Sequence, residues 1–383
     1  MKTILLAPDS FKGSLTAHEA AEAMERGVLA AMPEAHVIRH PVSDGGEGLV
    51  LVLSESMGGT IRYTDVSGPL PGQRVKARWA LSPDGSTAIL EMAEAAGLSL
   101  VPVEQRDPKS TTTYGVGELL RAALDDGARS IILGIGGSAT NDGGAGMAES
   151  LGAKLYDRDG KLLQRGGVAL QHLSGIDVRG LDARLKDISL IVACDVRNTL
   201  CGDEGASAVY GSQKGATPED VQLLDAALHR YGECLRSVLN IDVFNLPGGG
   251  AAGGLGAGLV AFCGAKLKTG IDVVLNATHF DEHLRSADLL ITGEGRIDDQ
   301  VRFGKALAGV IDRSRRAEVP VAAVVGAFLG ERNGIVNRNF LVDLETLVDD
   351  STTVDDAMRH AAGLLSARTG ILLQRIFRLH RSP

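Results

Sequence analysis

The chain has 383 residues, and glycine accounts for 49 of them, about 13% where about 7% is usual. Hydrophobic residues make up 44% and the net charge is -9, so there are enough apolar side chains for a core, and a disordered chain is excluded. The glycines have no three-residue period, which excludes collagen. The length suits two or three domains, each large enough to fold around its own core.

Charge and hydropathy exclude several kinds of partner. The 39 basic and 48 acidic residues leave no basic excess for nucleic acid or for an anionic membrane surface. No apolar run reaches the roughly 18 residues of a membrane span. The apolar run before Asp9 is too short for a signal peptide, and we therefore expect a cytoplasmic protein. The four cysteines form no C-x-x-C pair, which favours reduced thiols over disulfides or a zinc site.

Short apolar runs alternate with helical stretches along the chain, which is typical of a parallel α/β fold. In the first part we expect a strand at 4–7, a helix at 17–31 and a strand at 36–40. Thr16 and Glu19 have the spacing of a capping box, which marks the start of that helix. From 60 to 92 alternating runs are separated by turn residues, and this predicts an antiparallel excursion.

The α/β alternation then resumes. Helices are expected at 115–124, 220–239, 304–314, 354–365 and 370–379, and strands at 130–133, 189–193, 288–292 and 319–325. Five loops that directly follow predicted strands combine glycine with acidic or amide residues. Turn geometry explains the glycines but not the repeated acids and amides. Because ligands bind at the carboxyl ends of strands in open α/β sheets, we expect these loops to converge on one cleft.

The segment GIGGSATNDGG follows the strand at 130–133 and partly matches a dinucleotide fingerprint, G-x-G-x-x-A, at Gly134, Gly136 and Ala139. Successive N–H groups in a glycine-rich turn also form an anion site. The polar residues that follow, Thr140 to Asp142, favour a phosphate cradle over a dinucleotide site. Walker A and protein-kinase motifs are missing, so any phosphoryl transfer must use a different scaffold.

Six carboxylates lie in the loops, and Mg²⁺ is usually held by one or two carboxylates together with phosphates and water. They are Asp44, Glu47, Asp142, Asp195, Glu294 and Asp298. Lys12 lies in the first loop, where its charge suits a phosphate or a substrate carboxylate. Phosphoryl transfer needs such groups to position and neutralise its reactants. His279 and His283 are spaced i, i+4, but without the H-E-x-x-H pattern we expect a surface helix there.

Six segments together resemble the type-1 glycerate kinases. They are APDSFKGS (7–14), PVSDGGEG (41–48), GIGGSATNDGGAGM (134–147), CDVRN (194–198), PGGGAAGGLG (247–256) and TGEGRIDDQ (292–300). The resemblance implies transfer of phosphate from ATP to D-glycerate, with 2-phosphoglycerate as the product typical of the bacterial enzymes. It also implies two α/β domains with a cleft between them, one of them Rossmann-like and discontinuous. We expect that domain at 1–70 plus 290–383, and the second α/β domain at 71–289.

We expect direct in-line transfer from ATP with Mg²⁺, and the residues fall into four groups. The catalytic residues are Asp195, which orients the attacking hydroxyl, Lys12, and Glu294 as the second choice for the role of Asp195. The nucleotide is expected to contact Gly136, Gly137, Ser138, Asn141, Gly249, Gly250 and Gly253. Glycerate is expected to contact Asp9, Ser10, Lys12 and Asn198. The metal is expected at Asp44, Glu47 and Asp142.

Two residues depart from the family pattern, Thr199 where proline is usual and Val301 where a hydroxyl residue is usual. They leave open a non-catalytic sensor of small hydroxy acids on the same fold. The fingerprint-like glycines leave open an NAD-dependent oxidoreductase of a small hydroxy acid. The residues alone do not decide between 2- and 3-phosphoglycerate. They also leave the oligomeric state open, with a homo-oligomer as one alternative.

Overall fold

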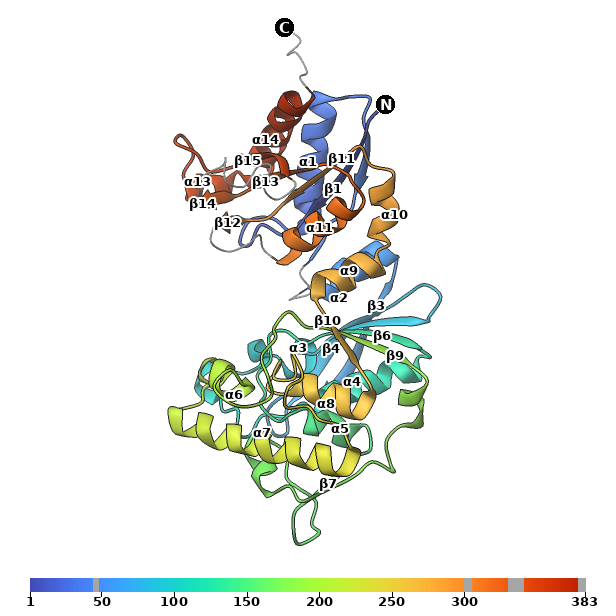
Figure 1. The fold of residues 1–383 in the computed structure, drawn as a ribbon, viewed down its shortest axis with the longest axis vertical. Helices are drawn as coiled ribbons and strands as arrows, with labels where there is room; N and C mark the ends of the chain where they lie inside the picture. Colours follow the sequence, from blue (N-terminus) through green and yellow to red (C-terminus); the bar gives the residue numbers. More distant parts are fainter. Residues whose placement is uncertain (44–47, 299–304, 330–340, 378–383) are drawn as a thin grey trace. The chain divides into compact units, whose positions relative to one another are not determined.

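A computed structural model describes residues 1–43, 48–298, 305–329 and 341–377. The chain divides into two compact units (Figure 1). The terminal unit comprises Met1–Asp44 and Val274–Pro383, and the middle unit comprises Gly45–Val273. These limits differ from the boundaries at 70/71 and 289/290 that the sequence led us to expect. None of the described helices is long and apolar enough to cross a membrane.

The terminal unit is built on a five-stranded sheet in the order β15-β13-β11-β1-β2, in which all neighbouring strands are parallel. Its elements are β1 (Thr3–Pro8), α1 (Ala17–Ala31), β2 (His36–Arg39), α10 (Phe280–Arg285), β11 (Leu289–Gly293), β12 (Arg296–Asp298), α11 (Lys305–Arg316), β13 (Val321–Val325), β14 (Ala327–Leu329), β15 (Leu341–Thr346), α13 (Val354–Arg359) and α14 (Ala361–Ile376). Strand β1 is buried along nearly its whole length, as a central strand covered on both faces must be.

The middle unit is built on a six-stranded sheet in the order β10-β9-β6-β5-β4-β3. Its elements are α2 (Leu49–Met57), β3 (Thr60–Ser67), β4 (Arg74–Leu81), β5 (Thr87–Glu91), α3 (Ala93–Ala96), α4 (Tyr114–Asp125), β6 (Ser130–Gly134), α5 (Ala145–Ser150), β7 (Lys154–Tyr156), β8 (Gly175–Asp177), β9 (Ser189–Ala193), α6 (Ala206–Tyr210), α7 (Pro218–Leu239), α8 (Leu255–Cys263) and β10 (Lys266–Lys268). Helix α9 (Gly270–Ala277) contains the limit between the units.

The antiparallel excursion is confirmed, since β3, β4 and β5 pair antiparallel before β6, β9 and β10 continue in parallel. It also explains the shifted boundary. Strand β3 pairs with β4 along its full length, from Thr60 opposite Leu81 to Ser67 opposite Arg74. A division at residue 70 would separate two strands that share their backbone hydrogen bonds.

Most predicted elements agree with the structure, and the local signals explain why. The Thr16–Glu19 capping box is present at the start of α1. Helix α7 begins two residues earlier than predicted, because Thr217 caps it and Pro218 occupies its first turn, where no intrahelical donor is needed. The prediction at the C-terminus was wrong, since the break between helices falls at His360 and α14 continues through Gly370.

Helix α14 lies beside α1 (Figure 1), and a Cβ added at Gly370 would lie 3.3 Å from the carbonyl oxygen of Gly27. A Cβ placed at Gly27 of α1 would lie 2.2 Å from the carbonyl oxygen of Ser366 and 2.9 Å from Cβ of Thr369. The two helix backbones therefore approach each other at Gly27. Close packing of this kind tolerates no added atom unless one helix moves.

We expect Gly27→Ala to lower the free energy of unfolding by about 1–3 kcal/mol, because the methyl group overpacks the α1–α14 contact. Gly363→Ala is the matched control, since a Cβ at this exposed position of α14 meets nothing within 4 Å. The control should be neutral or gain up to about 1 kcal/mol from helix propensity. Urea unfolding of both variants measures the difference, and equal midpoints would contradict the packing argument.

A buried histidine lies in the terminal unit directly after β2. His40 is 7% exposed, and its Nε2 lies 2.7 Å from Oγ1 of Thr278. The Thr278 hydroxyl donates its own proton to the carbonyl oxygen of Val274, so Nε2 of His40 carries the proton of this bond. Burial, with a smaller effect from His283, lowers the pKa of His40 to about 4.

We expect the protein to lose stability as the pH falls from about 6.5 toward 4, because the unfolded His40 takes up a proton that the folded one refuses. The loss from this group amounts to about 3 kcal/mol at most. His40→Gln keeps a donor but cannot titrate, so its unfolding curves should change less over this range. His279→Gln, at an exposed histidine, serves as the control. Parallel pH profiles for all three proteins would contradict the assignment.

Candidate functional site

Four parallel strands of the middle unit end side by side, and this edge carries most of the predicted site. The register places Glu91 of β5 opposite Gly134 of β6, and Gly134 opposite Ala193 of β9. Ala193 in turn lies opposite Lys268 of β10. The segments GIGGSATNDGG and CDVRN therefore leave the sheet next to each other, as the sequence predicted.

The loop between β6 and α5 exposes only its tip. Gly136 and Gly137 are exposed, while the rest of the predicted cradle, from Ser138 to Asp142, is buried. Gly137 has φ +70°, a backbone conformation that glycine adopts without strain. Asn141 is fully buried and donates through Nδ2 to Oγ of Ser207 at 2.9 Å. Ser138 and Asn141 thus contact the protein interior, and the backbone at Gly136 and Gly137 is what the loop presents to solvent.

Asp142, predicted as a metal ligand, is fully buried under the loop. Its carboxylate accepts hydrogen bonds from the backbone N–H of Thr113 at 2.8 Å, Gly144 at 3.1 Å and Gly146 at 3.3 Å. The Thr113 hydroxyl also donates to it at 3.0 Å. Burial raises the pKa of Asp142 above the usual range, opposed by these donors. Because protein donors occupy both oxygens, this geometry supports a positioning role for Asp142 and does not support a metal-ligand role.

The glycines of PGGGAAGGLG have a packing explanation. A Cβ at Gly250 would lie 2.0 Å from the carbonyl oxygen of Thr199, and one at Gly253 would lie 2.0 Å from that of Thr140. Gly253 also accepts a hydrogen bond from the backbone N–H of Gly143 at 2.9 Å. Gly249, Gly250 and Gly253 are all buried. These glycines let three backbone segments touch, and their contact with a nucleotide stays a prediction.

Asp195 and Asn198 follow β9 and are both half-buried. Asp195 accepts the backbone N–H of Gly270, the first residue of α9, at 2.8 Å through Oδ1. The Asn198 side chain is fixed at both ends, since its Oδ1 accepts from the Tyr210 hydroxyl at 2.7 Å and its Nδ2 donates to the carbonyl oxygen of Glu204 at 2.9 Å. The structure therefore holds both predicted residues in defined orientations at the carboxyl edge.

The terminal unit brings the remaining predicted residues to the carboxyl ends of its own strands. Pro8 of β1 lies opposite Gly293 of β11, so the loop with Asp9 and Lys12 begins beside the loop with Glu294. The backbone N–H of Asp9 donates to the carbonyl oxygen of Gly293 at 2.8 Å. Ser10 donates its backbone N–H to Oδ1 of Asp9 at 2.6 Å. Lys12 is exposed and Glu294 is half-buried.

The described part of the chain contains no group of three His, Cys, Asp or Glu side chains that could hold a metal ion. Asp44, Glu47 and Val301 lie outside the described residues, as does the side chain of Asp298. His279 precedes α10 with φ 55°, so it does not share a helical face with His283. The four cysteines are free.

Two buried ionisable residues at this edge escaped the sequence analysis. Glu91 accepts the backbone N–H of Gly48 at 2.8 Å and of Val50 at 3.1 Å, at the start of α2, and burial raises its pKa. An acid at the end of a strand was the same signal that singled out the other loops, so Glu91 could have been found. Lys214 donates into the β6–α5 loop, and nothing in its neighbourhood SQKG predicts this contact.

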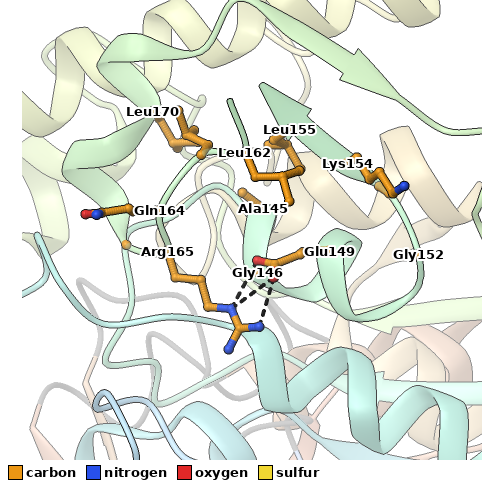
Figure 2. Close-up of a pocket in the computed structure, with 13 residues that line it drawn as sticks. Ala145, Gly146, Glu149, Gly152, Lys154, Leu155, Leu162, Gln164, Arg165 and Leu170 are labelled. Carbon is orange, nitrogen blue, oxygen red and sulfur yellow. Dashed lines mark hydrogen bonds and ion pairs between the residues drawn. The ribbon is translucent and has the colours of Figure 1, made fainter. Parts of the chain in front are cut away.

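A separate cavity of about 250 Å³ lies behind α5 in the middle unit. Leu155, Leu162 and Leu170 line the side away from an ion pair between Arg165 and Glu149, whose atoms are 2.8 Å apart (Figure 2). Arg165 also stacks on Tyr114, with 3.5 Å between the guanidinium carbon and the ring centroid. The cavity is smaller than the roughly 300–1,000 Å³ of ligand pockets, and it contains none of the predicted site residues.

Similar proteins of known sequence cover most of this chain. A glycerate 2-kinase of Escherichia coli (strain K12) is 49% identical over 335 residues, which cover 88% of this chain and 87% of that protein. A glycerate kinase of Bacillus subtilis (strain 168) is 49% identical over 332 residues, with 87% of each chain covered.

A crystal structure from Salmonella typhimurium LT2 that carries the name glycerate kinase 2 has a TM-score of 0.88 and 46% identity, with 98% of each chain covered. Residues 4–377 match the model of the glycerate kinase family. These matches confirm the resemblance that the loop motifs carry, and the chain belongs to the glycerate kinase family.

Proposed function

We propose that this chain transfers the γ-phosphoryl group of ATP to D-glycerate and forms 2-phosphoglycerate and ADP. The observation that carries this proposal is the family match over residues 4–377, which includes the strand-end loops that a phosphoryl transfer needs. The 2-position follows from the relative that carries the name glycerate 2-kinase. Nothing in the fold or in the relatives supports the alternatives of an NAD-dependent oxidoreductase or a non-catalytic sensor.

In this reaction the 2-hydroxyl oxygen attacks the γ-phosphorus in line, and the bond between that phosphorus and the β,γ-bridging oxygen breaks. ADP leaves with the electron pair of that bond. Asp195 accepts the hydrogen bond of the attacking hydroxyl through its carboxylate. The exposed backbone at Gly136 and Gly137 donates to the phosphates. Lys12 neutralises charge on the γ-phosphoryl group or on the carboxylate of glycerate.

Mg²⁺ would neutralise the phosphate oxygens of ATP during transfer. Such a cation would keep phosphate and water as most of its ligands. We assign Asp44 and Glu47 as its protein ligands, and we leave Asp142 out because its oxygens already accept protein donors.

Purified protein with ATP, Mg²⁺ and D-glycerate should release ADP and phosphorylate the 2-hydroxyl group. Phosphorus NMR identifies the product, because the 2- and 3-phosphate esters couple to different numbers of protons. L-Glycerate and reactions without Mg²⁺ are the controls. A 3-phosphate ester would overturn the regiochemistry alone. An absence of ADP above background, or a change in nicotinamide absorbance on adding NAD, would overturn the proposed activity itself.

Asp195→Asn should lower kcat by about 10²–10³, because the loss of a preorganised contact in the transition state costs this much. Asparagine still offers Oδ1 to Gly270, so α9 keeps its first hydrogen bond and the variant should fold. Asp157→Asn is the matched control, since Asp157 accepts backbone N–H groups in an exposed turn after β7. Steady-state kinetics decide the question, and near-normal turnover of Asp195→Asn would remove Asp195 from the mechanism.

A further inference from the structure

Lys214 is a buried cation that contacts the β6–α5 loop from inside the middle unit. It follows α6 in the turn Ser212–Lys214 and is 2% exposed. Its Nζ donates to Oγ of Ser138 at 2.8 Å and to the carbonyl oxygen of Thr140 at 2.7 Å. Both partners belong to the loop whose exposed tip is Gly136 and Gly137. One ammonium group therefore fixes two residues directly after that tip.

The charge of Lys214 has no direct counterion. Within the described residues Nζ forms no ion pair with a carboxylate, and both of its hydrogen-bond partners are neutral. The acid that acts on it through space is Asp142, and the loop's own donors already occupy that carboxylate. Arg106 adds a second cation, since its Nη1 reaches the carbonyl oxygen of Gln213 at 3.5 Å. Burial accordingly lowers the pKa of Lys214 to about 7.

A buried charge without a counterion is unfavourable, and an apolar side chain of similar volume often stabilises the packing as well or better. A methionine would fill the same volume without the desolvation cost. The charge becomes favourable when an anion binds nearby, because its field is weakly screened in the protein interior. The only exposed part of the adjoining loop, at Gly136 and Gly137, is where the phosphates of the nucleotide are expected.

We propose that Lys214 is a positioning residue for the nucleotide. It fixes Ser138 and Thr140 so that the N–H groups of the loop tip face the phosphates. The negative charge of the bound phosphates then balances the positive charge of Lys214 under the loop. This inference rests on the proposed kinase function and names the residue that prepares the phosphate loop. It assigns Lys214 no contact with the reacting atoms.

Three variants test the inference. Lys214→Met removes the charge and both hydrogen bonds at similar volume, Lys214→Arg keeps a charge at every pH, and Lys161→Met removes an exposed lysine as the control. Lys214→Met should raise KM for ATP by about 10- to 100-fold, as expected for charge-assisted hydrogen bonds. KM for glycerate should remain close to that of the wild type, and Lys161→Met should change neither constant.

The pH profile separates a charge from a packing role. Lys214 is charged below its pKa of about 7 and neutral above it, so kcat/KM for ATP in the wild type should fall as the pH rises through 7. For Lys214→Arg, kcat/KM for ATP should not fall over this range, and for Lys214→Met it should be low at every pH. Free ATP titrates equally in all assays, so differences between the variants report the enzyme.

Several results would overturn the inference. One is a folded Lys214→Met whose KM for ATP equals that of the wild type. The others are an equal rise in KM for ATP and for glycerate, or identical pH profiles of kcat/KM for the wild type and Lys214→Arg. If Lys214→Met does not fold, the comparison of wild type and Lys214→Arg decides alone. The shift in melting temperature that MgADP causes provides a readout without turnover, and it should shrink in Lys214→Met. If the wild type turns over no glycerate but MgADP raises its melting temperature more than that of Lys214→Met, only the proposed substrate fails.

Discussion

The carboxyl edge of the middle sheet depends on one constraint, the direct contact of three backbone segments. Thr140 to Gly144, Thr199 and Gly250 to Gly256 approach so closely that a single Cβ at Gly250 or Gly253 would overlap a carbonyl oxygen. Because no side chain separates them, each loop fixes the position of the next. Asp142, Asn141 and Lys214 are buried around this contact, and each forms a hydrogen bond there.

This arrangement gives rigidity to a loop that exposes only Gly136 and Gly137. A binding loop that is ordered before its ligand arrives loses little entropy on binding. The Asp142 carboxylate accepts a hydrogen bond from Thr113 at the start of α4. Lys214, from the turn after α6, donates to Ser138 in the middle of the loop. Asp142 and Lys214 therefore both form hydrogen bonds that hold the loop, and they form no ion pair with each other.

Much of the fold followed from the sequence, because its signals are local. The Thr16–Glu19 box, the apolar runs of the parallel strands and the turn residues between 60 and 92 each depend on neighbours in the chain. The direction in which Ser138 and Asn141 point depends on Ser207 and Lys214, about 70 residues away, and no local pattern encodes it. The same holds for the limit between the units, which depends on the pairing of β3 with β4.

The buried glycines also change what the family motifs mean. Gly250 and Gly253 are required by the folded backbone, whatever reaction the protein performs, so genetic drift cannot replace them while the fold survives. Lys12 is exposed and Asp195 half-buried, so packing limits substitution there far less than it does at the buried glycines. A descendant that had lost turnover would therefore keep most of its recognisable signature. The glycine motifs therefore report the folded backbone, and under the proposed mechanism the charged residues of the strand-end loops are the ones whose loss would turn a working kinase into a silent copy.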